Sequence, residues 1–251
     1  MPGAEDVARR ARASSGTEQP MHVVFTWEYA GESGNFRGDG AARVNPPDRF
    51  RLDLFSTGEG SLQATLVDGV LSTSGDIEGV ELPPTVFLYA MAGVFRPGDA
   101  PPAAGYEIPG SSVLEFAVEG GATRSYYLDE GRLTRLEERR AGRRERWIEL
   151  EWGSDRRWPR EARYRDIVDS SGVLWELVSA TAQAQPYDEE LYVLPIPRRS
   201  DGRDRDAPRA GGMLRLLRRR RAAQPHAHRV GRPDRKREHA VRHRGVADGR
   251  T

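Results

Sequence analysis

The chain has no cysteine, few histidines and no long apolar segment, and each absence excludes classes of function. Without cysteine, its 251 residues offer no disulfide, no thiol nucleophile and no attachment point for a lipid anchor. Four of the five histidines lie near the C-terminus, so His22 is the only one in residues 1–197. Neither a Ser-His-Asp triad nor a histidine-rich metal site can form from one histidine. We therefore expect no catalytic residues, no metal site and no cofactor, and we expect that the protein is not an enzyme.

The N-terminal residues lack the apolar stretch of a secretory signal peptide, because they read MPGAEDVARRARASSG. Taken literally, this predicts a cytoplasmic protein. Residues 1–21 are small, polar and charged, which predicts a disordered N-terminal segment.

The net charge of +1 hides two different kinds of polypeptide. Residues 198–251 carry 17 arginines and one lysine against six acidic residues, a net charge of +12, and contain no aromatic residue. Residues 1–197 carry −11 and alone have the composition to build a core. We expect the tail to be disordered. Arg, Ala, Gly and Pro, which are common in the tail, are encoded by GC-rich codons. Such a composition arises when GC-rich DNA is translated in a shifted reading frame. Our hypothesis is therefore that the native sequence ends shortly after Pro197.

A nucleic-acid-binding arm is the alternative interpretation of this tail, because arginine-rich segments bind phosphates by releasing counterions. The tail has no aromatic side chain on which bases could stack. We therefore expect no specific nucleic-acid partner.

Short segments with one apolar face dominate the first part of the body. Residues 22–74 read as a meander of about five strands separated by Gly, Asn and Asp turns. In segment 49–55, RFRLDLF, the apolar side chains point one way and Arg49, Arg51 and Asp53 point the other. This alternation is typical of antiparallel strands with one buried face.

A second series of strands runs from residue 112 to residue 181, with turns every 8–12 residues. Within it, Leu133 and Leu136 interrupt the alternation and predict a β-bulge. Residues 97–105 are rich in proline and predict a loop. About ten strands joined by sequential hairpins favour an up-and-down sheet.

The most apolar stretch lies between these two series and reads LPPTVFLYAMAGVFRP, residues 82–97. Its paired prolines suit the start of a helix, and Pro97-Gly98 ends it, so we predict a helix over residues 84–95. This helix is too short for a bilayer span of roughly 20 residues, yet it is apolar on nearly all sides and must be buried on more than one. The predicted fold is mainly β: a strongly curved antiparallel sheet, an unclosed β-barrel, with one or two helices covering its concave face.

The order of these elements resembles the LolA/LolB/LppX group of bacterial envelope lipoprotein carriers and receptors. The segments that carry the resemblance are the aromatic strand around Trp27, the meander RGDGAARVNPPDRFRLDLFSTGEGSLQATLVDG, the helix 84–95, WPREARYRDIVDSSGVLWEL and PYDEELYVLP. The resemblance implies a half-barrel domain over residues 22–197.

The resemblance also implies a function: non-enzymatic binding of lipid or lipoprotein acyl chains in a cavity between sheet and helix. It further implies a monomer in the periplasm or at the inner leaflet of the outer membrane, an envelope protein as a further partner, and membrane association only through an N-terminal anchor that this chain lacks. The expected lining is Phe25, Trp27, Phe50, Leu52, Leu54, Leu62, Leu66, Phe87, Met91, Val94, Phe95, Leu114, Phe116, Ile148 and Leu150.

A different class of function is open on the same residues. Buried helices are usually packed as core without a cavity beneath them. The alternative is therefore a structural or protein-interaction β module of the envelope with a filled core.

Overall fold

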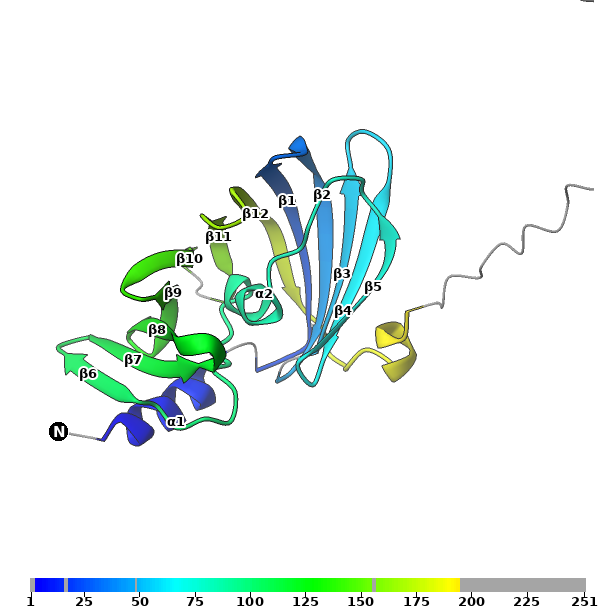
Figure 1. Ribbon diagram of the computed structural model, residues 1–251. Coiled ribbons are helices and arrows are strands. Elements are labelled where there is room, and N and C mark those ends of the chain that lie inside the picture. Colours follow the sequence, from blue (N-terminus) through cyan, green and yellow to red (C-terminus); the bar gives the residue numbers. More distant parts are fainter. Residues whose placement is uncertain (1–2, 16–17, 48, 155–156, 195–251) are drawn as a thin grey trace, which may run out of the picture. The chain divides into compact units, whose positions relative to one another are not determined.

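The computed structural model describes residues 3–15, 18–47, 49–154 and 157–194, and the predicted tail at 198–251 lies outside them. The described part is mainly β, with one twelve-stranded antiparallel sheet and two α-helices (Figure 1). The predicted fold class is confirmed. The strands are β1 (Met21–Gly31), β2 (Gly34–Asn45), β3 (Arg49–Ser56), β4 (Ser61–Val67), β5 (Val70–Asp76), β6 (Ala104–Ile108), β7 (Ser111–Val118), β8 (Ala122–Asp129), β9 (Arg132–Arg140), β10 (Arg143–Trp152), β11 (Pro159–Asp166) and β12 (Ser171–Ala182).

The order of strands across the sheet is β5-β4-β3-β2-β1-β12-β11-β10-β9-β8-β7-β6. Each neighbouring pair is a sequential hairpin except β1 and β12, which join the two ends of the β region at the middle of the sheet. The strands β5 and β6 form the two edges, so the sheet is not closed into a barrel. Residues 77–103 must therefore cross from one edge to the other.

The structure has two more strands than the sequence predicts, and one of them corrects the predicted loop at 97–105. Strand β6 begins at Ala104 and pairs with β7 at the edge of the sheet. Its five residues follow a proline-rich stretch, so local pattern alone gave little sign of a strand. The predicted bulge is confirmed, because the β8–β9 register shifts at Tyr127 and Leu128, opposite Leu133.

The apolar stretch forms a shorter helix than predicted. Helix α2 spans Thr85–Met91, and Pro84 precedes its first residue. The helix ends because Gly93 has a positive φ of 76°, and a Cβ there would lie 2.5 Å from the Trp152 ring. Val94 and Phe95 follow as buried residues outside the helix.

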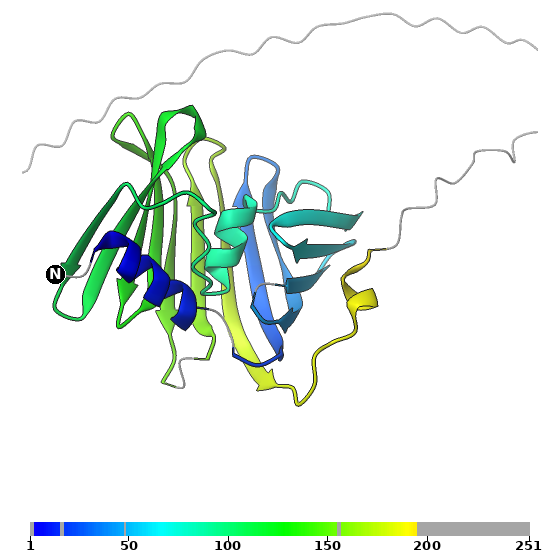
Figure 2. The same cartoon turned by 90° about the horizontal axis from the view of Figure 1, so that it is seen from below.

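The sheet curves around α2, which lies against its concave face (Figures 1 and 2). Alternate residues of the strands point toward this face, and side chains from α2 meet them in one continuous core. The core therefore lies between the sheet and the crossover segment, as the apolar character of residues 82–97 requires.

The N-terminal segment is the clearest correction to the sequence-based expectations, because residues predicted to be disordered form a helix. Helix α1 spans Ala4–Ser14 and lies against β6, β7 and β9 (Figure 2). Its contact stripe consists of Val7, Ala8 and Ala11, all buried. Small side chains let the helix approach the sheet closely: a Cβ built on Gly105 would lie 2.7 Å from the Ala4 Cβ.

Replacing Ala11 by glutamate should release α1 from the sheet. Burying a neutral polar group without a partner already costs about 1–3 kcal/mol and a carboxylate costs more, which a marginal helix contact cannot offset. Hydrogen exchange should show lost protection over residues 4–14, whereas the exposed control Ala141→Glu should leave it unchanged. Retained protection in Ala11→Glu would contradict the docked position of α1.

The outer face of β2–β4 is covered by the C-terminal part of the described chain, which contains the 3₁₀ helix η2 (Glu189–Tyr192). The Asn45 side chain donates to the Tyr187 carbonyl and accepts from the Tyr187 amide, both at 2.9 Å. Arg51 donates to the Leu191 carbonyl at 2.9 Å. The outward position predicted for Arg51 and Asp53 is confirmed, but Asp53 is buried rather than solvated because this segment and two arginines cover it.

Candidate ligand-binding site

The structure brings all fifteen residues of the expected lining into one buried cluster between the sheet and the crossover segment. Eleven come from β1, β3, β4, β7 and β10, and four from α2 and the two positions that follow Gly93. None of the fifteen is more than 7% exposed. Sequence alternation thus identified side chains on the buried, concave face of the sheet.

Aromatic contacts connect α2 to strands on both sides of the sheet. The Phe50 ring on β3 meets Tyr89 edge-on, with ring centroids 5.4 Å apart. On the other side, Phe87 lies 5.2 Å from the Tyr164 ring of β11. Helix α2 therefore spans the concave face from β3 to β11 and covers the strands between.

A second aromatic group surrounds the end of the crossover segment. The Phe95 ring lies 4.9 Å from Tyr126 and 6.1 Å from Phe116, and those two rings are 5.5 Å apart. Burial raises the pKa of Tyr126, so its hydroxyl stays protonated, and it donates to the Arg96 carbonyl at 3.4 Å. This contact fixes the chain just beyond Phe95.

Six aromatic residues of this cluster are absent from the sequence-based set: Tyr29, Tyr89, Tyr126, Trp158, Tyr164 and Trp175. A signal for four of them existed, because Tyr29, Tyr126, Tyr164 and Trp175 share the phase of apolar residues on their own strands. A buried tyrosine needs a partner for its hydroxyl, and alternation along one strand does not reveal that partner. The structure supplies partners for Tyr126 and for Tyr164, whose hydroxyl donates to Asp166 at 3.0 Å.

The candidate site is buried, because its fifteen side chains belong to one core cluster. None of the fifteen lines the four surface depressions that involve Tyr29, Glu81, Glu107 and Ile167. The largest of these, about 830 Å³, lies elsewhere, along the ends of β1, β2, β11 and β12, and its lining includes Glu28, Arg37 and Arg163. Occupation of the candidate site by a ligand therefore requires α2 to move.

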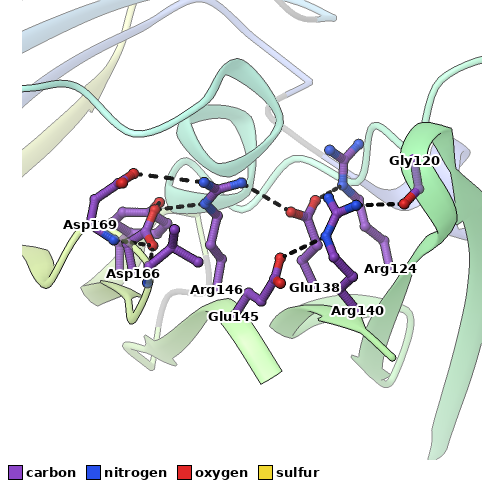
Figure 3. A network of polar contacts seen from close by, with 10 residues as sticks. Gly120, Arg124, Glu138, Arg140, Glu145, Arg146, Asp166 and Asp169 are labelled. Carbon is purple, nitrogen blue, oxygen red and sulfur yellow. Dashed lines mark hydrogen bonds and ion pairs between the residues drawn. The ribbon is translucent and has the colours of Figure 1, made fainter. Parts of the chain in front are cut away.

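Charged residues continue the concave face beyond the apolar cluster (Figure 3). Arg146 of β10 lies between two carboxylates, 3.2 Å from Glu138 and 2.6 Å from Asp166. Glu138 also accepts from Arg124 at 2.7 Å. Glu138 and Asp166 are both buried. The network therefore ties β8, β9, β10 and β11 together on the side that faces α2.

The sequence contained a sign of this network that the prediction did not use. In RERWIELEW, Arg146 is in phase with Ile148 and Leu150 on the apolar face, where an arginine requires partners. The partners come from other strands through the register that pairs Arg146 with Glu138 and with Asp166. Local alternation cannot supply that register.

Asp166 connects this network to α2 and to the turn after β11. Burial alone would raise the pKa of Asp166, but hydrogen bonds from Arg146, the Asp169 amide and the Tyr164 hydroxyl outweigh it and hold that pKa below its ordinary value. Tyr164 in turn touches Phe87 of α2. The carboxylate thus stays ionised at neutral pH and orders the chain on both sides of itself.

Within the described ranges, no group of three or more histidine, aspartate or glutamate side chains is arranged to hold a metal ion. Among the same residues, no helix is both long enough and apolar enough to cross a membrane.

Neither a protein-family model nor a curated protein matches the sequence. Solved structures with a similar arrangement include a domain from Vibrio parahaemolyticus described as an outer membrane lipoprotein-sorting protein, at 8% identity and a TM-score of 0.47, covering 75% of this chain and 95% of that one. A LolA superfamily protein from Nitrosomonas europaea matches at 8% identity and a TM-score of 0.46, covering 77% and 99%. A DUF1329 family protein from Desulfovibrio piger matches at 7% identity and a TM-score of 0.48, covering 76% and 95%. All three likenesses have TM-scores below 0.5, and neither ligand, partner nor location follows from them.

Proposed function

We propose that this protein binds the acyl chains of lipids or lipoproteins, without catalysis, between α2 and the concave face of the sheet. The observation that carries the proposal is how α2 is held. It is a separate apolar helix in a crossover segment, and Gly79, Pro84, Gly93 and Gly98 flank it. In the described part of the chain, its one hydrogen bond to another element is the Tyr89 hydroxyl, which accepts from the Gly69 amide at 3.2 Å.

Helix α2 is therefore retained by side-chain packing, and an acyl chain offers the same kind of surface. Exposing Phe87, Leu88, Tyr89 and Met91 would cost about 6–12 kcal/mol, at about 1.5–3 kcal/mol for each side chain. Burying about 14 methylenes of a long acyl chain would contribute about 11 kcal/mol. The two amounts are close, so an exchange of helix for ligand is energetically accessible and reversible.

The proposal also covers the cellular location of the protein and its partners. The sequence resemblance supports a role in lipoprotein or lipid trafficking in the periplasm or at the inner leaflet of the outer membrane. An envelope protein would deliver or receive the ligand, and the protein would act as a monomer. Reversible binding needs no cofactor, and no nucleophile–base pair is assigned to this site.

A brominated fatty acid tests the proposal on the full chain, since bromine quenches nearby tryptophan fluorescence. Trp27 and Trp175 lie on the concave face, whereas Trp147 lies on the outer face. We expect saturable quenching by dibromostearate. Trp27→Phe/Trp175→Phe should reduce it, and the matched control Trp147→Phe should preserve it. Trp152 and Trp158 also pack in or against the buried cluster and retain part of the quenching.

Two other results would contradict the proposal. Quenching that depends on Trp147 would place the ligand on the outer face. If the folded protein shows no saturable quenching, the acyl-binding proposal fails.

The second candidate is a structural or protein-interaction module of the envelope with a filled core. The observation that favours it is the close packing of all fifteen candidate residues in one buried cluster. In that case dibromostearate should leave the fluorescence of Trp27 and Trp175 unchanged, while the folded domain still captures a protein partner.

A further inference from the structure

The β9–β10 hairpin carries four arginines around its two-residue turn, in the sequence RRAGRR at 139–144. Ala141 and Gly142 both have positive φ, 48° and 78°, as a tight hairpin turn requires. The register places Arg140 directly opposite Arg143 and Arg139 opposite Arg144. Like charges directly opposite one another destabilise a sheet, so this hairpin tip carries a cost that its own fold does not explain.

Neighbouring carboxylates compensate only part of this charge. Glu137 is fully buried on the outer face and pairs with Arg139 at 3.0 Å and Arg144 at 3.1 Å. Arg140 pairs with Glu145 at 3.3 Å. Arg143 is exposed and forms no ion pair with any residue of the described ranges. The tip therefore keeps a positive charge directed toward solvent.

Two exposed aliphatic side chains lie beside this tip. Ile167 and Val168, in the turn between β11 and β12, are 57% and 58% exposed. They line a depression of about 480 Å³ together with Arg140, Arg143 and Arg144. Positive charge and exposed aliphatic surface thus come from two different hairpins and meet at one rim of the sheet.

The exposure of these aliphatic residues is built into the turn. The Ile167 amide donates to the Glu145 carbonyl at 2.8 Å, which joins the turn to β10. The Val168 amide donates to the Asp166 side chain at 2.9 Å. Asp166 is held by Arg146 (Figure 3). The turn is therefore fixed with Ile167 and Val168 outward.

We propose that this rim, the hairpin tip 139–144 with Ile167 and Val168, docks on a bilayer that contains anionic phospholipid. Arginine guanidinium groups pair with lipid phosphates, and the two aliphatic side chains enter the interface beneath them. A soluble polyanion would satisfy the arginines but would leave Ile167 and Val168 in water. A neutral apolar partner would bury the aliphatic groups but would leave the charge of Arg143 uncompensated. The combination fits a charged lipid surface, and it gives the protein a membrane contact besides the N-terminal anchor implied by the sequence resemblance.

The absence of cysteine allows the rim to be labelled at one position in the full chain. Val168→Cys would carry an environment-sensitive dye, and Val70→Cys, at a similarly exposed valine of 64% in strand β5, is the matched control. We expect mixed vesicles of phosphatidylcholine and phosphatidylglycerol to shift the emission at position 168 to the blue and to make it quenchable by brominated lipid. The dye at position 70 should remain in water. This comparison separates rim insertion from adsorption through the arginine-rich residues 198–251, which would affect both labels alike.

A second experiment removes positive charge from the rim. Each arginine near an anionic surface is worth a factor of roughly five in binding, so Arg140→Gln/Arg143→Gln should weaken the signal at position 168 by roughly 25-fold. The exposed pair variant Arg160→Gln/Arg163→Gln on β11 should not reproduce this loss. The proposal is overturned if both labels respond equally, if phosphatidylcholine alone gives the full shift, or if soluble polyphosphate reproduces it. None of these outcomes depends on acyl-chain binding beneath α2.

Discussion

Replacing Arg146 by methionine is expected to lower the free energy of unfolding by about 3 kcal/mol at neutral pH, because breaking a buried ion pair leaves uncompensated charge. Methionine keeps the apolar stem of the side chain but removes the cation between Glu138 and Asp166, which are only 4% and 3% exposed. Both carboxylates retain other hydrogen bonds, from Arg124 and from the Asp169 amide, so the loss should lie near the lower end of the range for such pairs. Urea unfolding of the two proteins measures it.

The pH dependence of this loss gives a sharper signature. In the wild type, the pKa of Asp166 is held low, so its stabilising contribution is present above the unfolded pKa and is lost as the pH falls through the lower folded value. Without Arg146, burial dominates and should raise that pKa above the unfolded value. Protonation of Asp166 then stabilises the folded Arg146→Met variant. The difference in unfolding free energy between wild type and variant should therefore become smaller as the pH falls from about 7 to about 4.5.

The matched control for this experiment is Arg160→Met, the same substitution in an exposed ion pair with Glu151. Exposed pairs contribute little to stability, so this variant should unfold like the wild type at both pH values. A pH-independent loss in Arg146→Met would mean that the side chain stabilises the fold by packing rather than by charge.

Replacing Phe87 by alanine should have the largest effect on α2. The side chain is fully buried between α2 and β11, and removal of such a phenylalanine costs about 3–5 kcal/mol. The control is Phe55→Ala. Because the Phe55 side chain is 51% exposed, its removal should lower the free energy of unfolding much less. Thermal or urea unfolding would distinguish them.

The same variant tests whether α2 moves aside for a ligand. If a bound acyl chain displaces α2, a helix held less tightly costs less to displace, and dibromostearate should bind more than about tenfold more tightly, since 1.4 kcal/mol corresponds to tenfold. If the core is simply filled, Phe87→Ala should lose stability without gaining affinity. Unchanged stability would instead contradict the packing of Phe87 in the core.

Alternation along the chain was sufficient to identify the antiparallel strands and their buried faces. Segments such as 49–55 expose one apolar face, and that period of two is a local property that the chain carries before it folds. The apolar segment 82–97 was equally informative, because a helix without a polar face must be buried on more than one side. The end of that helix was predicted only in part: Val94 and Phe95 are buried as predicted, but they lie after Gly93 and outside the helix.

Three features depended on contacts between distant segments. Helix α1 has a polar sequence, and its small contact stripe gains a partner only where Gly105 lets a helix approach the sheet. The network around Arg146 depends on the register that brings Glu138 and Asp166 beside it. The rim joins RRAGRR to Ile167 and Val168 because β10 pairs with β11.

The sequence by itself therefore determined the class of fold, the apolar face of each strand and the need to bury residues 82–97. The tertiary structure alone decided that residues of α2 and of the strands join in one buried cluster, that charged residues share the concave face, and which turns meet at the rim. The physical reason is the separation along the chain over which each kind of interaction acts. Periodicity and turn chemistry act over a few neighbouring residues, whereas the register between distant strands and the docking of small-residue helices are set by the energy of the whole packed domain.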